Sequence, residues 1–172
     1  MFIELIATVF AGIACAGVAM LLNLTTGRRL PKWIMPVAAG LGMIGMTISN
    51  EYTWFDRTAE RLPEGVEIAS TVQEQGWLRP WTQLWPYTKR FAAVDTATAR
   101  TNENLPDQRL ADLYFFGRWS PVNQAPMLFN CATAQSALLI DGATFAADGT
   151  VADAAWEKMP ADDPILKLVC ES

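Results

Sequence analysis

The first 49 residues contain two long apolar runs joined by a short basic connector, and this pattern constrains the whole chain. The first run extends over residues 2–24 and the second over residues 33–49. A helix needs roughly 20 apolar residues to cross the hydrocarbon of a bilayer, with about 17 as a minimum. The connector, residues 25–32, is too short to do anything but reverse the chain direction. The sequence therefore predicts a transmembrane helical hairpin over residues 1–49, with the lipid bilayer as its partner.

The charges that flank the two runs predict the orientation of this hairpin. Arg28, Arg29 and Lys32 lie in the connector, whereas Glu4 and Glu51 lie on the outer flanks. Basic residues favour the cytoplasmic side of a membrane. We therefore expect a cytoplasmic connector, with both termini and the main domain in the periplasm at a bacterial inner membrane.

The first run could also be a cleaved signal peptide or a lipoprotein signal instead of a transmembrane helix. A cleaved signal peptide would need a basic start, which is missing. Lipidation of Cys15 would need the same basic start, and Gly12 stands where a branched aliphatic residue is expected. We therefore interpret Cys15 as a small residue inside the first helix.

Small residues recur at helical spacing in the second run, among them Gly42 and Gly45, with Ala38 and Ser49 on the same face. Small residues let membrane helices approach closely. The pattern predicts a helix contact, either within the hairpin or with another membrane protein or a second copy of the chain. The alternative is that glycine and alanine are simply frequent in membrane helices.

Residues 50–172 have the size of one small domain, and their charge restricts its partners. They hold ten of the 13 Lys and Arg residues and 17 of the 18 Asp and Glu residues, so their formal charge is −7. An acidic domain offers no electrostatic footprint for nucleic acid, and none for anionic lipid headgroups. We predict no nucleic-acid partner.

The chain contains no histidine, which excludes Ser-His-Asp and Cys-His catalysis, histidine-ligated haem and most zinc sites. No glycine-rich phosphate loop of either usual spacing occurs. We predict no catalytic residues, no cofactor and no metal, and therefore a protein that is not an enzyme.

An enzymatic alternative would have to use carboxylates. Asp95, Asp107 and Asp112 are the candidates for general acid–base work, but their spacing does not show two carboxylates facing each other. Asp141 and Asp148 are weaker candidates for a cation site, because Asp-Gly steps are ordinary turns and hard cations need more oxygen ligands. We interpret these carboxylates as solvated surface groups.

The predicted fold class is α+β, with an N-terminal transmembrane helical hairpin, a small antiparallel β-sheet domain and a short C-terminal helix. Residues 50–86 form an exit segment and a tryptophan-rich linker or strand, and residues 87–172 form a disulfide-bonded antiparallel β domain. The exit segment begins with a short helix that ends before Pro63. A C-terminal helix starts with Asp163 as its cap and Pro164 in its first turn.

The β domain is predicted as a meander of five or six short strands. We expect strands over residues 65–72, 90–95, 109–119 and 127–140, the last with a bulge in its small-residue middle, a loop tip over 102–108 and a connection over 120–126. Asp141-Gly142 and Asp148-Gly149 are predicted as hairpin turns.

Trp77, Trp81 and Trp85 are spaced four residues apart, between Gly76 and Tyr87. Prolines at 80 and 86 limit any helix here to about one and a half turns. The preferred interpretation is burial of the three indoles over one end of the sheet, because large aromatics usually contribute buried area. A binding groove for a partner and a contact with the membrane surface are the alternatives.

Cys131 and Cys170 lie outside the predicted membrane segments, on the oxidising side by the charge argument. We predict that they form one structural disulfide. A redox-active pair is the alternative, but the usual C-x-x-C spacing is absent.

The succession AAVDTATART, RLADLYFF, MLFNC, an Asp-Gly turn and ILKLVC resembles the surface-adhesin protein E type of domain of Gram-negative bacteria, over roughly residues 87–172. The resemblance implies an antiparallel sheet packed against a C-terminal helix, with Asp95 as a turn residue and a bridge between Cys131 and Cys170. Asn130 stands where the family carries an aspartate, and the family has a secretion signal or a lipid anchor. The chain also looks like small membrane proteins of alphaproteobacteria, which implies no function.

Together these features predict a non-enzymatic, inner-membrane-anchored protein-interaction module of the periplasm. The alternative is an accessory (supernumerary) subunit of a larger inner-membrane respiratory or transport complex. The candidate interaction residues are Trp77, Trp81 and Trp85 in the domain, and Gly42 and Gly45 in the hairpin.

Overall fold

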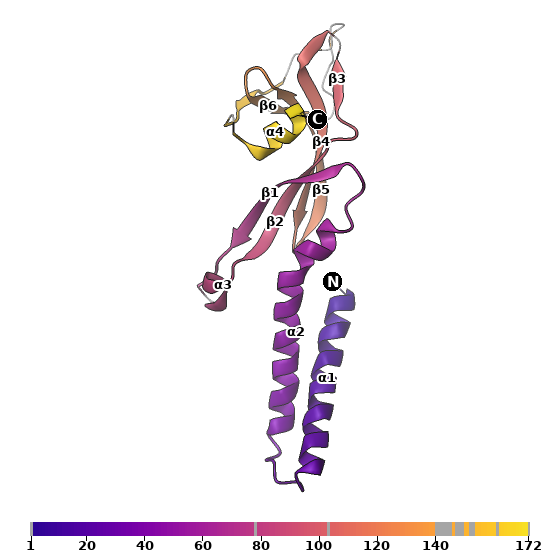
Figure 1. Cartoon of the computed structure of the whole chain (residues 1–172), viewed down its shortest axis with the longest axis vertical. Helices are drawn as coiled ribbons and strands as arrows, with labels where there is room; N and C mark the ends of the chain where they lie inside the picture. Colours follow the sequence, from indigo (N-terminus) through magenta and orange to yellow (C-terminus); the bar gives the residue numbers. More distant parts are fainter. Residues whose placement is uncertain are drawn as a thin grey trace. The chain divides into compact units, whose positions relative to one another are not determined.

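The computed structural model describes residues 2–77, 79–102, 104–139, 146, 150–151, 154–160 and 162–171. The chain divides into two compact units, Met1–Trp54 and Phe55–Ser172 (Figure 1). The first is helical, and the second contains an antiparallel sheet and a short C-terminal helix. The predicted α+β class is confirmed.

The N-terminal unit consists of helix α1, Phe2–Thr25, and most of helix α2, Ile34–Ala59. The extent of α1 agrees with the prediction to within one residue. The helix predicted for the start of the exit segment is present and ends before Pro63, and it is the continuation of α2, which runs without a break to Ala59. Residues 46–62 contain neither glycine nor proline, so no residue of the breaker types interrupts the helix there.

Glycines mark the contact between the two helices. A Cβ atom added to Gly42 would lie 2.5 Å from the sulfur of Cys15 and 3.0 Å from the carbonyl oxygen of Ala11. A Cβ on Gly12 would lie 2.6 Å from the terminal methyl of Met43. Gly42 therefore belongs to the contact within the hairpin. Nothing lies within 4 Å of a Cβ placed on Gly45.

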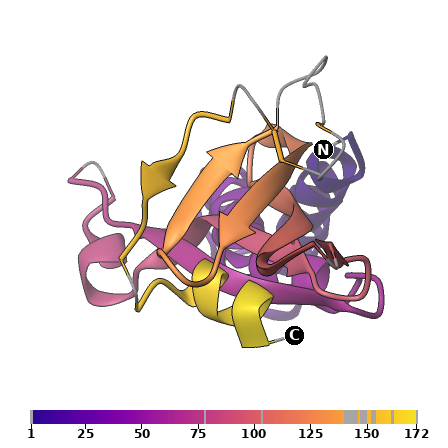
Figure 2. The same cartoon turned by 90° about the horizontal axis from the view of Figure 1, so that it is seen from above.

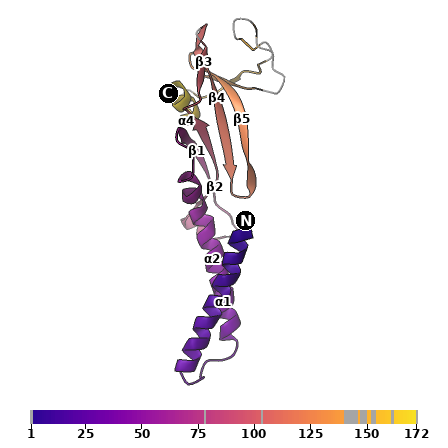
Figure 3. The same cartoon turned by 90° about the vertical axis from the view of Figure 1, so that its right-hand side faces the viewer.

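Over the residues that the structure describes, the sheet of the second unit has seven strands, and each of their pairings is antiparallel. The strands are β1 Val66–Glu74, β2 Tyr87–Asp95, β3 Arg100–Asn102, β4 Leu105–Gly117, β5 Ser120–Asn130, β6 Gln135–Leu138 and β7 Glu157–Lys158. Their order is β1-β2-β4-β5-β6-β7, with β3 paired to β4. The long β4–β5 hairpin forms the centre of the sheet (Figure 3).

Two predicted loops are strands. Residues 105–108 belong to β4, because they pair with the neighbouring strands rather than forming a loop tip. Residues 120–126, predicted as a connection, form the first half of β5. Proline is tolerated on a strand with a free edge, and β5 pairs with β6 only over Met127–Asn130. Pro121 therefore lies where the outer side of β5 has no strand partner. Pro126 lies just outside the pairing with β6, and its carbonyl oxygen accepts the N–H of Leu139 at 2.9 Å.

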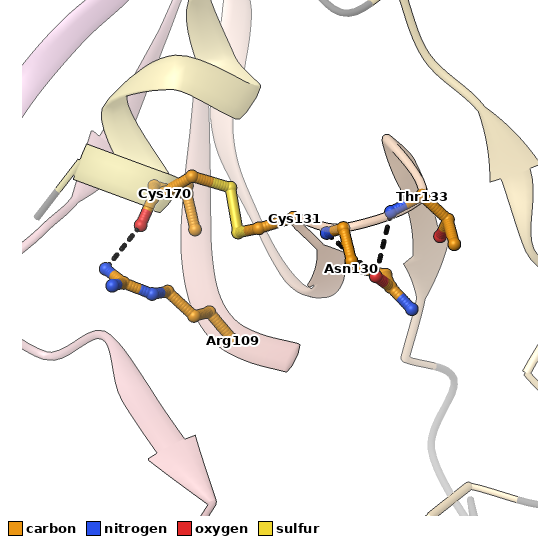
Figure 4. Close-up of a disulfide and its surroundings, with 7 residues drawn as sticks. Arg109, Asn130, Cys131, Thr133 and Cys170 are labelled. Carbon is orange, nitrogen blue, oxygen red and sulfur yellow. Dashed lines mark hydrogen bonds between the residues drawn. A yellow bond between two sulfur atoms is a disulfide. The ribbon is translucent and has the colours of Figure 1, made fainter. Parts of the chain in front are cut away.

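The stretch 127–140 was predicted as one bulged strand, and its described residues 127–138 form a hairpin of β5 and β6. Strand β5 ends at Asn130, whose side-chain oxygen accepts hydrogen bonds from the N–H groups of Ala132 and Thr133, both at 3.1 Å (Figure 4). Ala134 then adopts a left-handed conformation, with φ of 51°. An Asn side chain that bonds the following backbone is a standard turn former, so the small residues form a turn instead of a bulge. The predicted Asp141-Gly142 and Asp148-Gly149 turns lie outside the described residues.

Helix α4, Pro164–Glu171, lies on the concave side of the curled sheet (Figure 2). Asp163 caps it as predicted, with its carboxylate accepting the N–H of Ile165 at 2.8 Å. The core beneath α4 consists of buried side chains from three strands and the helix: Val94, Ala111, Leu113, Phe129, Leu166 and Val169.

The opposite face of the sheet carries an aromatic stack. Phe91 and Phe116 are nearly parallel, with ring centroids 4.6 Å apart, and Phe55 meets Phe91 edge-on at 5.2 Å. Phe91 on β2 is 2 % exposed. The sheet is therefore covered on both faces near the middle of β2, which explains the continuous buried run of residues 91–94.

Candidate functional site

The C-terminal helix is fastened to the sheet at its far end. Cys131 and Cys170 form a disulfide, with Cα atoms 5.9 Å apart (Figure 4). Arg109 on β4 donates a hydrogen bond to the carbonyl oxygen of Val169 at 2.8 Å. The predicted pairing is confirmed, and it links the β5–β6 turn to the last turn of α4.

Next to the N-terminal turn of α4, the face of the sheet that α4 packs on is open and forms a groove of about 500 Å³. Its floor and walls come from four strands and from Ile165 at the start of α4. The lining residues are Ser70, Val72, Arg90, Phe91, Ala92, Phe115, Phe116, Gly117, Ser120, Pro121, Asn123 and Ile165. An eight-residue helix is too short to cover the full length of the strands beneath it, which leaves this part of the face open.

The groove combines an apolar surface with a few polar groups at its margin. Val72 and Phe115 are 48 % and 41 % exposed. Among the described residues that line the groove, Arg90 alone is charged, and none carries a carboxylate, thiol or imidazole. Such a surface can bury apolar side chains of a partner and place a negative group beside Arg90.

The tryptophan segment connects β1 to β2 and includes the short helix α3, Trp81–Leu84. Trp77, Trp81 and Trp85 are 82 %, 39 % and 65 % exposed. The preferred interpretation of burial over the sheet is therefore wrong. The loop is organised instead by Thr82, whose side chain is buried.

The hydroxyl of Thr82 accepts the N–H of Gly76 at 2.9 Å and donates to the carbonyl oxygen of Arg79 at 2.7 Å. These two bonds close the loop through one small polar side chain. The loop therefore holds its conformation without using the indoles as a core.

The candidate carboxylates do not converge on the groove. Asp95 ends β2, and its carboxylate accepts the N–H of Thr98 at 3.1 Å, which is a turn role. Asp107 and Asp112 lie five positions apart on β4 and therefore on opposite faces of the sheet. Within the described part of the chain, no three His, Cys, Asp or Glu residues are grouped so as to hold a metal ion. Asp141 and Asp148 lie outside that part.

One helix meets the requirements for a membrane span. Among the described residues, α1 alone is long and apolar enough to cross a bilayer, as judged by its length and composition. The apolar part of α2 is shorter, because Asn50 and Glu51 follow it within the same helix. A second span within α2 stays a prediction.

The aromatic run at residues 114–116 is a sequence signal that could have indicated the groove. Tyr114, Phe115 and Phe116 place aromatic rings on both faces of β4. One face holds the stack of Phe116 on Phe91, and the other presents Phe115 to the groove. Trp119 and Val122, 59 % and 55 % exposed, were also not recognised as surface residues.

No protein-family model matches the chain, and no curated protein or solved structure shows detectable similarity to it.

Proposed function

We propose that the chain is a non-enzymatic protein-interaction module, anchored in the inner membrane of a bacterium with its β domain in the periplasm. The groove beside α4 carries this proposal. It joins a partly exposed apolar floor to a single cation, Arg90, in a domain whose net charge is negative. A partner segment with an apolar side chain and a nearby acidic group fits this surface best.

Two further observations support the proposed location. Helix α1 is apolar enough to span a bilayer, and a disulfide joins Cys131 to Cys170. Disulfides persist in oxidising compartments such as the periplasm. The charge difference between the connector and the outer flanks supports the same side for the β domain.

The likeness to the surface-adhesin protein E type of domain stays part of the proposal. The turn role of Asp95 and the bridge from Cys131 to Cys170 agree with what that resemblance implies. An adhesin-type sheet held at the inner membrane would bind a partner within the envelope, because it would not be displayed on the cell surface.

Site-specific photo-crosslinking tests the groove. Asn123 and Gln124 are adjacent, exposed residues of β5, but only Asn123 lines the groove. A photoreactive amino acid at position 123 should give a discrete protein adduct in intact membranes, and the same group at position 124 should not. Equal labelling from the two positions, or none from 123, would contradict a binding role for the groove.

An accessory subunit of a larger membrane complex is the second candidate function, and Gly45 favours it. This glycine faces open space on α2, so a helix of another protein could approach the backbone closely there. Native electrophoresis after extraction in mild detergent separates the two functions. A stable complex that is lost on Gly45→Leu would support the subunit function, and migration as a monomer would oppose it.

A further inference from the structure

Large apolar side chains are exposed together at one end of the sheet. They come from the β1–β2 connection and from the region of the β4–β5 turn. The residues are Trp77, Trp81, Leu84, Trp85, Trp119 and Val122, with exposed fractions of 82 %, 39 %, 74 %, 65 %, 59 % and 55 %. None of them belongs to the core of the domain.

Strand register places both segments at the same end. Glu74 at the end of β1 pairs with Tyr87 at the start of β2, and Arg90 pairs with Gly117 at the end of β4. The backbone N–H of Arg118 then donates to the carbonyl oxygen of Lys89 at 3.0 Å. We call this end, residues 74–90 and 117–123, the aromatic-basic end.

The charge of the aromatic-basic end is opposite to that of the domain. It carries the basic residues Arg79, Lys89, Arg90 and Arg118 and one acidic residue, Glu74, which is ion-paired with Lys89. Its formal charge is therefore +3, within a domain of formal charge −7. Four of the ten basic residues of the domain lie at this end. The negative net charge of the domain does not reveal this local cluster.

Indole and guanidinium groups together favour binding at the headgroup layer of an anionic bilayer. Tryptophan prefers the headgroup level of a bilayer, where its ring is apolar and its N–H meets water. Lys and Arg near an anionic bilayer surface are each attracted to the phosphate layer. The hydrogen bonds of Thr82 with Gly76 and Arg79 hold the loop in shape while the indoles remain outward.

We propose that the aromatic-basic end docks on an anionic lipid bilayer surface, with the indoles and Leu84 in the headgroup layer and the basic side chains on lipid phosphates. Anchorage of the chain in the membrane through α1 would hold the domain close to a bilayer surface. Such tethering gives a weak second contact with the bilayer a high effective concentration. The inference goes beyond the interaction-module function, since it assigns a lipid surface to the three tryptophans, Leu84 and Arg79, which do not line the groove, whereas Arg90 belongs to both surfaces. It also corrects the expectation from net charge that the domain has no attraction for anionic headgroups.

Depth-dependent fluorescence quenching tests the proposal on the full chain. In a Cys15→Ser background, an environment-sensitive fluorophore is attached to Leu84→Cys in one sample and to Thr133→Cys in another. Thr133 is exposed in the β5–β6 turn, away from the aromatic-basic end. The protein is reconstituted into phosphatidylcholine vesicles with or without about one-third phosphatidylglycerol, and both contain lipid with a quencher near the headgroup.

The probe at position 84 should be quenched in the phosphatidylglycerol vesicles and released at high salt, because screening weakens the charge term. The probe at position 133 should be unaffected by either vesicle. The double variant Arg79→Gln/Arg90→Gln should lose most of the difference between the two vesicle compositions. Equal quenching at positions 84 and 133, or quenching at 84 that ignores lipid charge and salt, would overturn the proposal.

A third probe, at Val18→Cys on the exposed side of α1, separates this proposal from the anchor. Quenching at position 18 by a quencher deep in the acyl chains reports insertion of the helix whatever the domain does. Insertion without quenching at 84 contradicts the docking surface alone, and failure at position 18 contradicts the proposed anchor. Protection of the position-84 probe that is independent of lipid composition would indicate a contact with a second copy of the chain, and it too would overturn the proposal.

Discussion

Arg118 donates its backbone N–H to the carbonyl oxygen of Lys89 at 3.0 Å, and this bond closes the end of the sheet where the β4–β5 turn meets β2. The bond brings two basic residues that are distant in sequence to one surface, beside the exposed tryptophans. A domain with an acidic average therefore has a basic, aromatic end.

The disulfide should make the largest single contribution to the stability of the β domain. It closes a loop between residues 39 apart, and the chain-entropy relation gives about 4 kcal/mol for a loop of this length. The variant Cys131→Ser/Cys170→Ser should lose about that much free energy of unfolding in denaturant titrations of the detergent-solubilised chain.

Cys15→Ser is the matched control for this prediction, because Cys15 is the free cysteine and lies in α1. It should leave the unfolding midpoint of the β domain unchanged. If peptide mapping without reductant finds Cys131 and Cys170 both open to alkylation in protein from membranes, the pairing does not form in the cell.

Asn130 should be replaceable by Asp but not by Ala. Its side-chain oxygen accepts two backbone hydrogen bonds in the β5–β6 turn, and a carboxylate oxygen can accept both. Asn130→Ala should lower the free energy of unfolding by about 1–2 kcal/mol, as measured by denaturant titration. Asn130→Asp should cost little, and equal losses in the two variants would show that the oxygen has no role.

Alanine substitutions at Gly42 and at Gly45 should change the melting temperature of the hairpin in opposite directions. A Cβ on Gly42 would lie 2.9 Å from the Cβ of Cys15 and 3.0 Å from the carbonyl oxygen of Ala11, whereas a Cβ on Gly45 meets nothing. Gly42→Ala should lower the melting temperature of the hairpin in detergent, since packing strain costs about 1–3 kcal/mol. Gly45→Ala should raise it slightly, because alanine favours helix by about 1 kcal/mol over glycine. A rise for Gly42→Ala would contradict the contact.

Thr82→Val should loosen the tryptophan loop. Valine keeps the shape of the buried side chain but removes the hydroxyl that bonds Gly76 and Arg79. Leaving the N–H of Gly76 without this acceptor costs about 1–3 kcal/mol if it stays buried. Hydrogen exchange should accelerate across residues 76–85 in the variant, with exchange in β4 as the internal reference.

Thr82→Ser retains the hydroxyl and should preserve the slow exchange of the loop. If Val and Ser variants exchange at the same rate as the natural residue, the loop is held by other contacts.

Local signals explain which parts of the fold could be predicted. The apolar runs gave the positions of α1 and most of α2, and the Asp163-Pro164 pair gave the start of α4, because helix ends depend on nearby side chains. The Cys131–Cys170 pairing followed from cysteine number and compartment. Each of these inferences needed only sequence neighbours or a simple count.

Long-range pairing explains the errors. Pro121 and Pro126 indicate a connection when read locally. Pro121 is accommodated because the outer side of β5 has no strand partner there, and Pro126 takes part through its carbonyl oxygen, which accepts the N–H of Leu139. Asn130 could have been recognised as a turn former, yet the apolar residues on either side favoured one long strand. Burial of the tryptophans depends on what the loop lies against in space, which residue spacing does not specify.

The groove could not be predicted for the same reason. It exists because α4 is short and the disulfide holds it over one part of the sheet. Phe115 and Val72 are ordinary strand residues in sequence, and their exposure follows only from the position of α4.

Protease accessibility of the C-terminus tests the central claim, a membrane-anchored domain on the periplasmic side, most directly. The full chain with a C-terminal epitope is produced in a Gram-negative bacterium, and protease is added to spheroplasts and to inside-out membrane vesicles. We predict loss of the epitope in spheroplasts and protection in inside-out vesicles, with the epitope sedimenting with membranes before digestion. Protection in spheroplasts with loss in inside-out vesicles, or an epitope in the soluble fraction, would contradict it.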